Sequence, residues 1–172
     1  HTALSVFGAL GEQVRQAIPD GQSVLVIAFA ETATAIGAAI AATLPGTVYF
    51  MQTTRENVPN TDYLYFSETH SHATEQRLCT RGLDEVLPKV QHIVFAEDEV
   101  TTGNTILHLI DALCARYDLA HITFGVASLL NGMTPESWEV YQNKGIWTRY
   151  LLATDNAQLS ETAARFPADG DR

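Results

Sequence analysis

Short apolar runs alternate with helix-like segments along the chain, and this alternation constrains the fold more than any other feature. Short apolar runs bounded by turn residues are typical of strands that are buried on both faces. The runs predicted to be strands are 23–28, 47–51, 92–96, 122–130 and 146–152. Apolar residues at helical spacing predict helices over 4–18, 35–44, 106–117 and 135–142. This order predicts an α/β domain with a mostly parallel central sheet flanked by helices.

Two parts of the chain fit this alternation less directly. Residues 63–66 are predicted to be a strand or one side of a hairpin, and residues 78–87 are predicted to form a helix. After the last strand the sequence becomes polar. We therefore expect one domain over residues 1–154, followed by a polar segment, 155–172, that forms a tail or the start of a linker to a further domain.

Composition excludes several classes of function. The 172 residues include 10 basic and 20 acidic side chains, a formal net charge of −10, and no basic block is present. We therefore expect neither a nucleic-acid partner nor a membrane-surface partner, because both present negative charge that basic patches bind. Hydrophobic residues make up 46% of the chain, enough for a packed core. With only Cys79 and Cys114, a disulfide framework is not expected, and the default location is cytoplasmic.

The strongest functional signal lies where the third predicted strand ends, in the sequence FAEDEVTTGNT. Glu97 and Asp98 follow the apolar run directly, and a loop rich in threonine then passes through Gly103 into a helix. Backbone N–H groups at a helix N-terminus bind phosphate, threonine hydroxyls add donors, and glycine lets the backbone approach the anion. The carboxylates can accept hydrogen bonds from sugar hydroxyls and lie close to a divalent metal. The motif therefore predicts a site for a phosphorylated ribose.

This motif resembles the phosphoribosyl-pyrophosphate signature of the type I phosphoribosyltransferases. The matching positions are Glu97, Asp98, Thr101, Thr102, Gly103 and Thr105. The sequence departs from the family at Glu99, where an apolar residue is usual, and at Asn104, where a second small residue is common. The resemblance implies the type I phosphoribosyltransferase fold. It also implies a glycosyltransferase that transfers phosphoribose between pyrophosphate and the nitrogen of a base or nucleoside precursor.

The same resemblance implies a role for each part of the motif. Glu97 and Asp98 would act at the ribose as catalytic and binding groups, and Asp98 would also contact Mg²⁺. The 5′-phosphate would lie against a loop made of Val100, Thr101, Thr102, Gly103, Asn104 and Thr105. The implied partners are phosphoribosyl pyrophosphate and a small-molecule base, whose identity stays open, and a homodimer is left open as well.

Two other predicted strand ends supply candidate ligands for pyrophosphate. Ala30, Glu31 and Thr32 occupy the place of the family's pyrophosphate loop, without the Gly or Lys that many members have there. The Glu31 carboxylate repels pyrophosphate unless a metal intervenes or the side chain turns away. It is equally well explained as an acid favoured by a helix N-terminus. Arg55, after the second strand, is a candidate phosphate ligand or an ordinary surface arginine.

His70 and His72 lie in a polar segment that corresponds to a mobile catalytic loop in many type I enzymes. Residues two apart share a face of an extended chain, so the pair could donate protons, bind pyrophosphate or ligate a metal. A plain surface loop is the alternative. The stretch from Tyr49 to this segment is similar to a bacterial subgroup encoded with tellurium-resistance and stress genes. A second hypothesis for function is a sensor that binds a phosphoribosyl ligand and regulates a partner without turnover.

Overall fold

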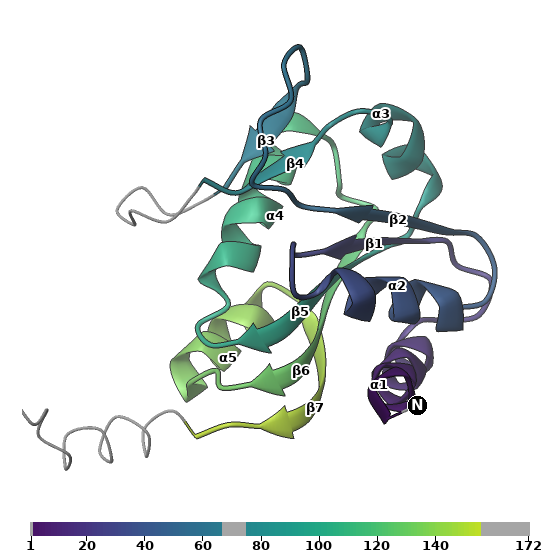
Figure 1. Cartoon of the computed structure of the whole chain (residues 1–172), viewed down its shortest axis with the longest axis vertical. Helices are drawn as coiled ribbons and strands as arrows, with labels where there is room; N and C mark the ends of the chain where they lie inside the picture. Colours follow the sequence, from purple (N-terminus) through teal and green to yellow (C-terminus); the bar gives the residue numbers. More distant parts are fainter. Residues whose placement is uncertain (1, 67–74, 156–172) are drawn as a thin grey trace, which may run out of the picture.

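A computed structural model describes residues 2–66 and 75–155 of the chain (Figure 1). Its helices are α1 (Thr2–Ala17), α2 (Thr34–Thr43), α3 (Leu83–Val86), the short 3-10 helix η1 (Leu87–Lys89), α4 (Asn104–Arg116) and α5 (Pro135–Asn143). Its strands are β1 (Val24–Ala28), β2 (Val48–Gln52), β3 (Tyr63–Tyr65), β4 (Arg77–Cys79), β5 (His92–Val100), β6 (Thr123–Asn131) and β7 (Trp147–Ala153). Across these ranges, no helix is both long enough and apolar enough to cross a membrane.

The central sheet is parallel throughout and has the strand order β2-β1-β5-β6-β7. Val24 at the start of β1 pairs with Val48 of β2 on one side and with His92 of β5 on the other. The predicted α/β fold is thus confirmed. Because all five strands run the same way, their carboxyl ends meet at one edge of the sheet. In open α/β sheets, ligands bind outside this edge.

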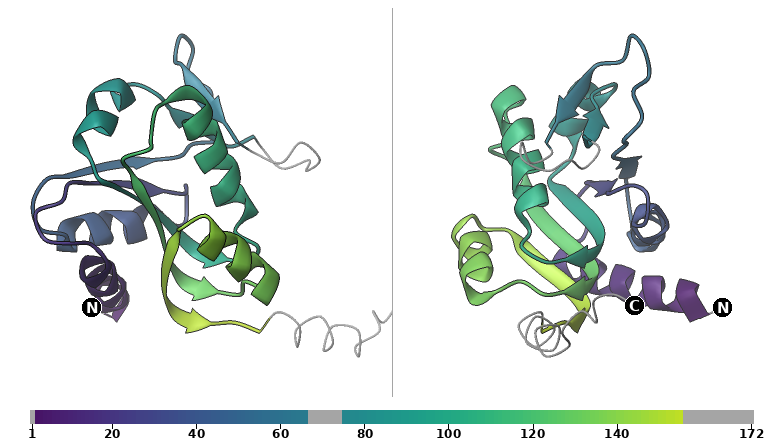
Figure 2. Two further views of the ribbon diagram at one scale, coloured as in Figure 1. Left: turned by 180° about the vertical axis from the view of Figure 1, so that it is seen from behind. Right: turned by 60° about the vertical axis from the view of Figure 1, so that its left-hand side comes forward.

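Helices cover both faces of the sheet, as the two views of Figure 2 show. Helices α1 and α2 pack together on one face, and α4 and α5 lie on the other. The small residues of α2 allow close packing, since a Cβ added at Gly37 would lie 2.6 Å from the Cβ of Ala28 in β1. Strands β1 and β5 form the centre of the core, and Val26, Ile27 and Val94 are fully buried there.

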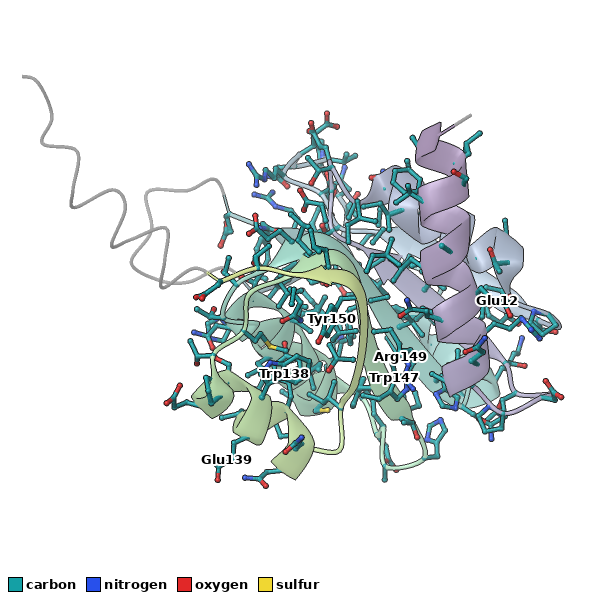
Figure 3. All side chains as sticks on the ribbon, turned by 90° about the horizontal axis from the view of Figure 1, so that it is seen from below. Glu12, Trp138, Glu139, Trp147, Arg149 and Tyr150 are labelled. Carbon is teal, nitrogen blue, oxygen red and sulfur yellow. The ribbon has the colours of Figure 1, made fainter. Side chains whose placement is uncertain are left out.

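The outer strand β7 is held by aromatic contacts on both faces (Figure 3). Trp138 of α5 packs on Tyr150, with ring centroids 6.0 Å apart. On the other face the Trp147 indole fills the space above Gly125 of β6, where an added Cβ would lie 2.1 Å from the ring, and the Arg149 guanidinium lies 5.7 Å from the Trp147 ring centroid. The tight fit between β6 and β7 therefore depends on a glycine in the strand.

Between β2 and β5 one prediction is confirmed and another is wrong: Tyr63–Tyr65 form a strand on one side of a hairpin, whereas residues 78–87 do not form a single helix. Instead of one helix over 78–87, the chain forms strand β4, which pairs antiparallel with β3 through Leu64 and Leu78, and then only one turn of helix at α3. Leucines at 78, 83 and 87 resemble a helical repeat. However, Gly82 adopts a φ of +83°, which interrupts helical geometry between the first two. Leu78 is instead fully buried against the core from a strand.

Candidate functional site

Strand β5 extends to Val100 rather than ending at Ala96, so the acidic residues stand inside the strand. The long strand β6 supplies their partners: Glu97 pairs with Ser128, and Glu99 pairs with Leu130. The prediction that Glu97 already leaves the sheet is therefore wrong. Side chains two apart on a strand share a face, and Glu97 and Glu99 both line a cavity at the carboxyl edge of the sheet.

This cavity has a volume of about 60 Å³ and is open to solvent on one side. Its lining residues are Glu97, Glu99, Val100, Thr101, Thr102, Gly103, Asn104, Thr105 and Ile106. The structure thus brings together Glu97 and the whole loop predicted to bind phosphate. Asp98 is not among the lining residues. Val100 is 2% exposed, so its side chain belongs to the core and only its backbone is available to a ligand.

The loop reaches α4 through a left-handed residue. Gly103 has φ +74° and ψ 7° and immediately precedes the first helical residue, Asn104. The Asn104 N–H donates to the Thr102 hydroxyl over 3.2 Å. A backbone amide and threonine hydroxyls therefore lie together beside the cavity, at the N-terminus of a 13-residue helix. Such a combination favours an anion.

The Glu97 carboxyl is half-buried, and its ionisation is unfavourable. Burial, the negative charge of Asp98 and a side-chain hydrogen bond between the two together raise the pKa of Glu97 to about 8. At neutral pH Glu97 is therefore mostly protonated and can donate a hydrogen bond as well as accept one. A neutral Glu97 also reduces the negative charge beside the loop predicted to bind phosphate.

The loop after β1 is attached to the ends of the neighbouring strands. The Phe29 N–H donates to the Ala96 carbonyl over 3.0 Å, and the Ala30 N–H donates to the Thr53 hydroxyl over 2.9 Å. Thr53 is 1% exposed and stands just after β2, and its own N–H donates to the Ala28 carbonyl. The peptide bond between Ala30 and Glu31 is cis. The three hydrogen bonds, from the N–H groups of Phe29, Ala30 and Thr53, hold the loop at the same edge of the sheet as the cavity.

The candidate pyrophosphate residues on this loop face outward. Glu31 and Thr32 are exposed, and Ala30 is half-buried. Arg55 is also exposed, in the segment that follows β2, and β2 is the strand beside β1. The structure therefore brings these residues to the edge of the sheet that carries the loop predicted to bind phosphate. His70 and His72 lie outside the described residues, so the roles predicted for them stay predictions.

Arg77 of β4 is a buried cation that sequence reasoning missed. Its backbone N–H and carbonyl both pair with Thr54, next to Arg55. The guanidinium lies over the rings of Tyr63 and Tyr65, 5.6 and 5.4 Å from their centroids, and 3.6 Å from the exposed carboxylate of Glu75. Arg77 thus fixes the backbone that carries Arg55. Because the pairing joins distant parts of the chain, no local motif signals it.

Comparison with known proteins places this geometry in a family. A family model described as "Phosphoribosyl transferase" matches residues 1–151. The chain belongs to this family. No curated protein sequence is similar enough to count as a match.

Solved structures similar to this chain include three adenine phosphoribosyltransferases. The enzyme from Giardia lamblia, complexed with 9-deazaadenine, has a TM-score of 0.59 and 15% identity over 86% of this chain and 79% of its own. The Leishmania tarentolae enzyme has a TM-score of 0.57 and 17% identity over 87% and 71%. The Trypanosoma brucei enzyme, in complex with AMP, pyrophosphate and ribose-5-phosphate, has a TM-score of 0.55 and 16% identity over 88% and 68%. These likenesses show a shared fold.

Among the residues that the structure describes, no group of three or more His, Cys, Asp or Glu side chains could hold a metal ion. The end of β5 carries three consecutive acids, Glu97, Asp98 and Glu99, and the first two form the adjacent pair that the sequence predicts to act at the site. Mg²⁺ commonly binds to one or two carboxylates and completes its coordination with water and substrate phosphates. This donor set therefore fits a Mg²⁺ ion that arrives with a phosphorylated substrate.

Proposed function

We propose that this phosphoribosyl transferase uses phosphoribosyl pyrophosphate and Mg²⁺ to transfer phosphoribose to, or from, a nitrogenous base or nucleoside precursor. One observation carries the proposal: a carboxyl group from β5 and the N-terminal amides of α4 line one small cavity at the carboxyl edge of the sheet. Carboxyl groups suit the ribose hydroxyls, and the amides suit a phosphate. Family membership and the fold shared with the adenine enzymes support the same reading.

In this proposal the chain's own groups bind and orient the substrate. The loop 101–105 holds the 5′-phosphate, and Glu97 and Asp98 hold the ribose hydroxyls. The backbone of residues 30–32 and the Arg55 guanidinium hold the pyrophosphate. Arg55 can form paired hydrogen bonds with phosphate oxygens, which fixes their orientation. Asp98, with Glu97 beside it, would hold Mg²⁺, which neutralises pyrophosphate charge when bound.

The reaction at C1 of the ribose then requires little covalent chemistry from the protein. The bond from C1 to pyrophosphate breaks as the bond to a nitrogen nucleophile forms, and positive charge develops on the sugar. Fixed negative charge and correct alignment of the two partners lower this barrier. Asp98 supplies the charge nearest to the sugar in this proposal. His70 and His72 are proposed to close over the site as proton donors or pyrophosphate ligands.

Release of pyrophosphate tests the proposal. The purified protein is incubated with phosphoribosyl pyrophosphate, Mg²⁺ and a panel of purines, pyrimidines and simple amines, and pyrophosphate is measured by a coupled assay. We expect release with at least one acceptor and its loss in Asp98→Asn. Asp111→Asn, which changes an exposed acid on α4, is the matched control and should retain activity. Equal activity in the two variants would contradict the assignment of Asp98.

A second candidate function is a sensor that binds the phosphoribosyl ligand without turnover. The observation that favours it is Glu31, an exposed acid in the loop where pyrophosphate would bind. Calorimetry distinguishes the two: tight binding of phosphoribosyl pyrophosphate with no release in the presence of any acceptor would support the sensor. Rapid release with one acceptor would exclude it.

Three further parts of the hypothesis need other tests. The domain boundary after residue 154, the similarity to the tellurium-associated subgroup and a homodimer stay predictions. Limited proteolysis tests the boundary, and light scattering tests the dimer. Growth of a deletion strain on tellurite tests the link to tellurium resistance.

A further inference from the structure

Tyr141 of α5 reaches the phosphate-binding loop through a buried hydrogen bond. Its side chain is fully buried, and its hydroxyl donates to the carbonyl of Gly103 over 2.7 Å. The two residues are 38 positions apart in the sequence. Tyr141 does not line the cavity beside the loop, so it can influence a ligand there only through Gly103.

Gly103 leaves just enough space for this contact. A Cβ added at Gly103 would lie 2.4 Å from the Tyr141 hydroxyl oxygen and 2.8 Å from Cε1 of its ring. Glycine is therefore required here for two reasons, the positive φ of 74° and the approach of the tyrosine. The start of α4 requires only the positive φ of Gly103, so the close approach of Tyr141 is an additional constraint on this position.

The hydrogen bond fixes the orientation of one peptide group. The Gly103 carbonyl accepts from Tyr141 and also from the Leu107 N–H, at 3.2 Å, in the first turn of α4. In a trans peptide the C=O and N–H groups point in opposite directions. Holding the carbonyl inward therefore turns the Asn104 N–H outward, where the Thr102 hydroxyl accepts it over 3.2 Å. A phosphate oxygen can replace this long hydrogen bond.

Away from the contact between Gly103 and Tyr141, open space lies between the loop and the rest of α5. A second cavity, of about 160 Å³, separates Thr102 and Asn104 from Glu136, Ser137 and Val140 of that helix. With this space open, the Tyr141 hydroxyl is a direct link between α5 and the loop. Burial raises the pKa of this hydroxyl, so it stays protonated and acts as a donor at all physiological pH values.

We propose that Tyr141 is a positioning residue for 5′-phosphate binding, which holds the Gly103–Asn104 peptide with its N–H toward the phosphate. This inference rests on the proposed function. Without the hydroxyl, the Gly103 carbonyl loses one of its two donors and the peptide can rotate. Affinity for a 5′-phosphate should then fall, while binding of pyrophosphate, assigned to residues 30–32 and Arg55, should not change.

The test compares two ligands in two variants. Tyr141→Phe removes the hydroxyl and keeps the buried ring. Tyr117→Phe is the control, because that hydroxyl is buried at the other end of α4 without a hydrogen-bond partner in the described part of the chain. Calorimetry measures the Kd of ribose 5-phosphate and, separately, of magnesium pyrophosphate, and circular dichroism checks the fold. We expect Tyr141→Phe to weaken ribose 5-phosphate by about three- to tenfold, as loss of one hydrogen bond predicts.

Each outcome bears on a different claim. An unchanged Kd for ribose 5-phosphate in Tyr141→Phe overturns the role of Tyr141, and so does equal weakening of both ligands, since that indicates a general loss of structure. Weakening of the same size in Tyr117→Phe overturns it too. If the wild-type protein fails to bind ribose 5-phosphate at all, the proposed function fails first and the inference fails with it.

Discussion

The raised pKa of Glu97 predicts an unusual pH dependence of stability. Glu97→Gln is the perturbation, because glutamine has nearly the same shape and keeps a hydrogen-bond donor but cannot ionise. In the folded chain, the Glu97 carboxyl holds its proton up to about pH 8, whereas an unperturbed carboxyl loses it near pH 4.5. Between these values the folded state binds more protons than the unfolded state. The free energy of unfolding of the wild type must then fall as the pH rises.

The size of this loss of stability follows from the pH range between the two pKa values. The slope is about 1.4 kcal/mol per pH unit, which gives an upper limit of roughly 5 kcal/mol between pH 4.5 and pH 8. Because the Glu97 side chain is only partly buried, water reduces this, and we expect about 2–4 kcal/mol. Because glutamine cannot ionise, the Glu97→Gln variant does not lose this free energy of unfolding as the pH rises. It should be similar to the wild type near pH 5 and more stable by about 2–4 kcal/mol at pH 8.

Urea unfolding measures this directly, with the fluorescence of Trp138 and Trp147 as the signal, at pH 5, 6, 7 and 8. Glu99→Gln is the matched control: Glu99 lies two residues further on the same strand and is exposed. Its curve should run parallel to that of the wild type. If the wild-type and Glu97→Gln stabilities instead keep a constant difference from pH 5 to pH 8, the burial argument for Glu97 is refuted.

Two other predictions concern backbone contacts at the site, and urea unfolding measures both. Gly103→Ala places a Cβ 2.4 Å from the Tyr141 hydroxyl at a positive φ, so it should lose about 2–4 kcal/mol of stability, whereas Gly82→Ala, with a φ of +83° and open space, should lose only about 1–2 kcal/mol. Equal losses would show that the tyrosine contact is not tight. Thr53→Val leaves the Ala30 N–H without its acceptor and should lose about 1–3 kcal/mol, while Thr53→Ser, which keeps the hydroxyl, should lose less. If Val and Ser are equivalent, the hydrogen bond does not stabilise the loop.

Much of the fold could be predicted because local sequence encodes it. The apolar runs at 24–28 and 92–96 are buried on both faces, so nearly every side chain in them had to be apolar. Of the hairpin of β3 and β4, the sequence predicts the β3 side, but β4 and its pairing could not be predicted. The two strands have only three residues each, and their pairing depends on contacts between distant parts of the chain. In such short segments, periodicity does not distinguish a strand from a helix.

In the candidate site too, features made of adjacent residues could be predicted, and features that join distant residues could not. The loop from Thr101 to Thr105 could be recognised because its threonines, glycine and helix start are adjacent in the sequence. Thr53 and Tyr141 could not, since each acts on a backbone group 23 or 38 residues away. The exit of the chain from the sheet at Glu97 was mispredicted for a related reason. Whether a charged residue continues a strand depends on the length of the neighbouring strand, here β6.

The extension of β5 has a consequence for the thermodynamics of recognition. Because Glu97 and Asp98 lie within the ladder between β5 and β6, folding has already fixed the backbone that carries them. A sugar that binds there meets groups that need no ordering. The loop at Thr101 and Thr102 lies beyond the ladder, and both threonine side chains are exposed. Binding enthalpy from the sugar side should therefore be largely retained as affinity, whereas contacts from the two threonine hydroxyls to the phosphate are offset by the entropy lost when these exposed side chains are ordered.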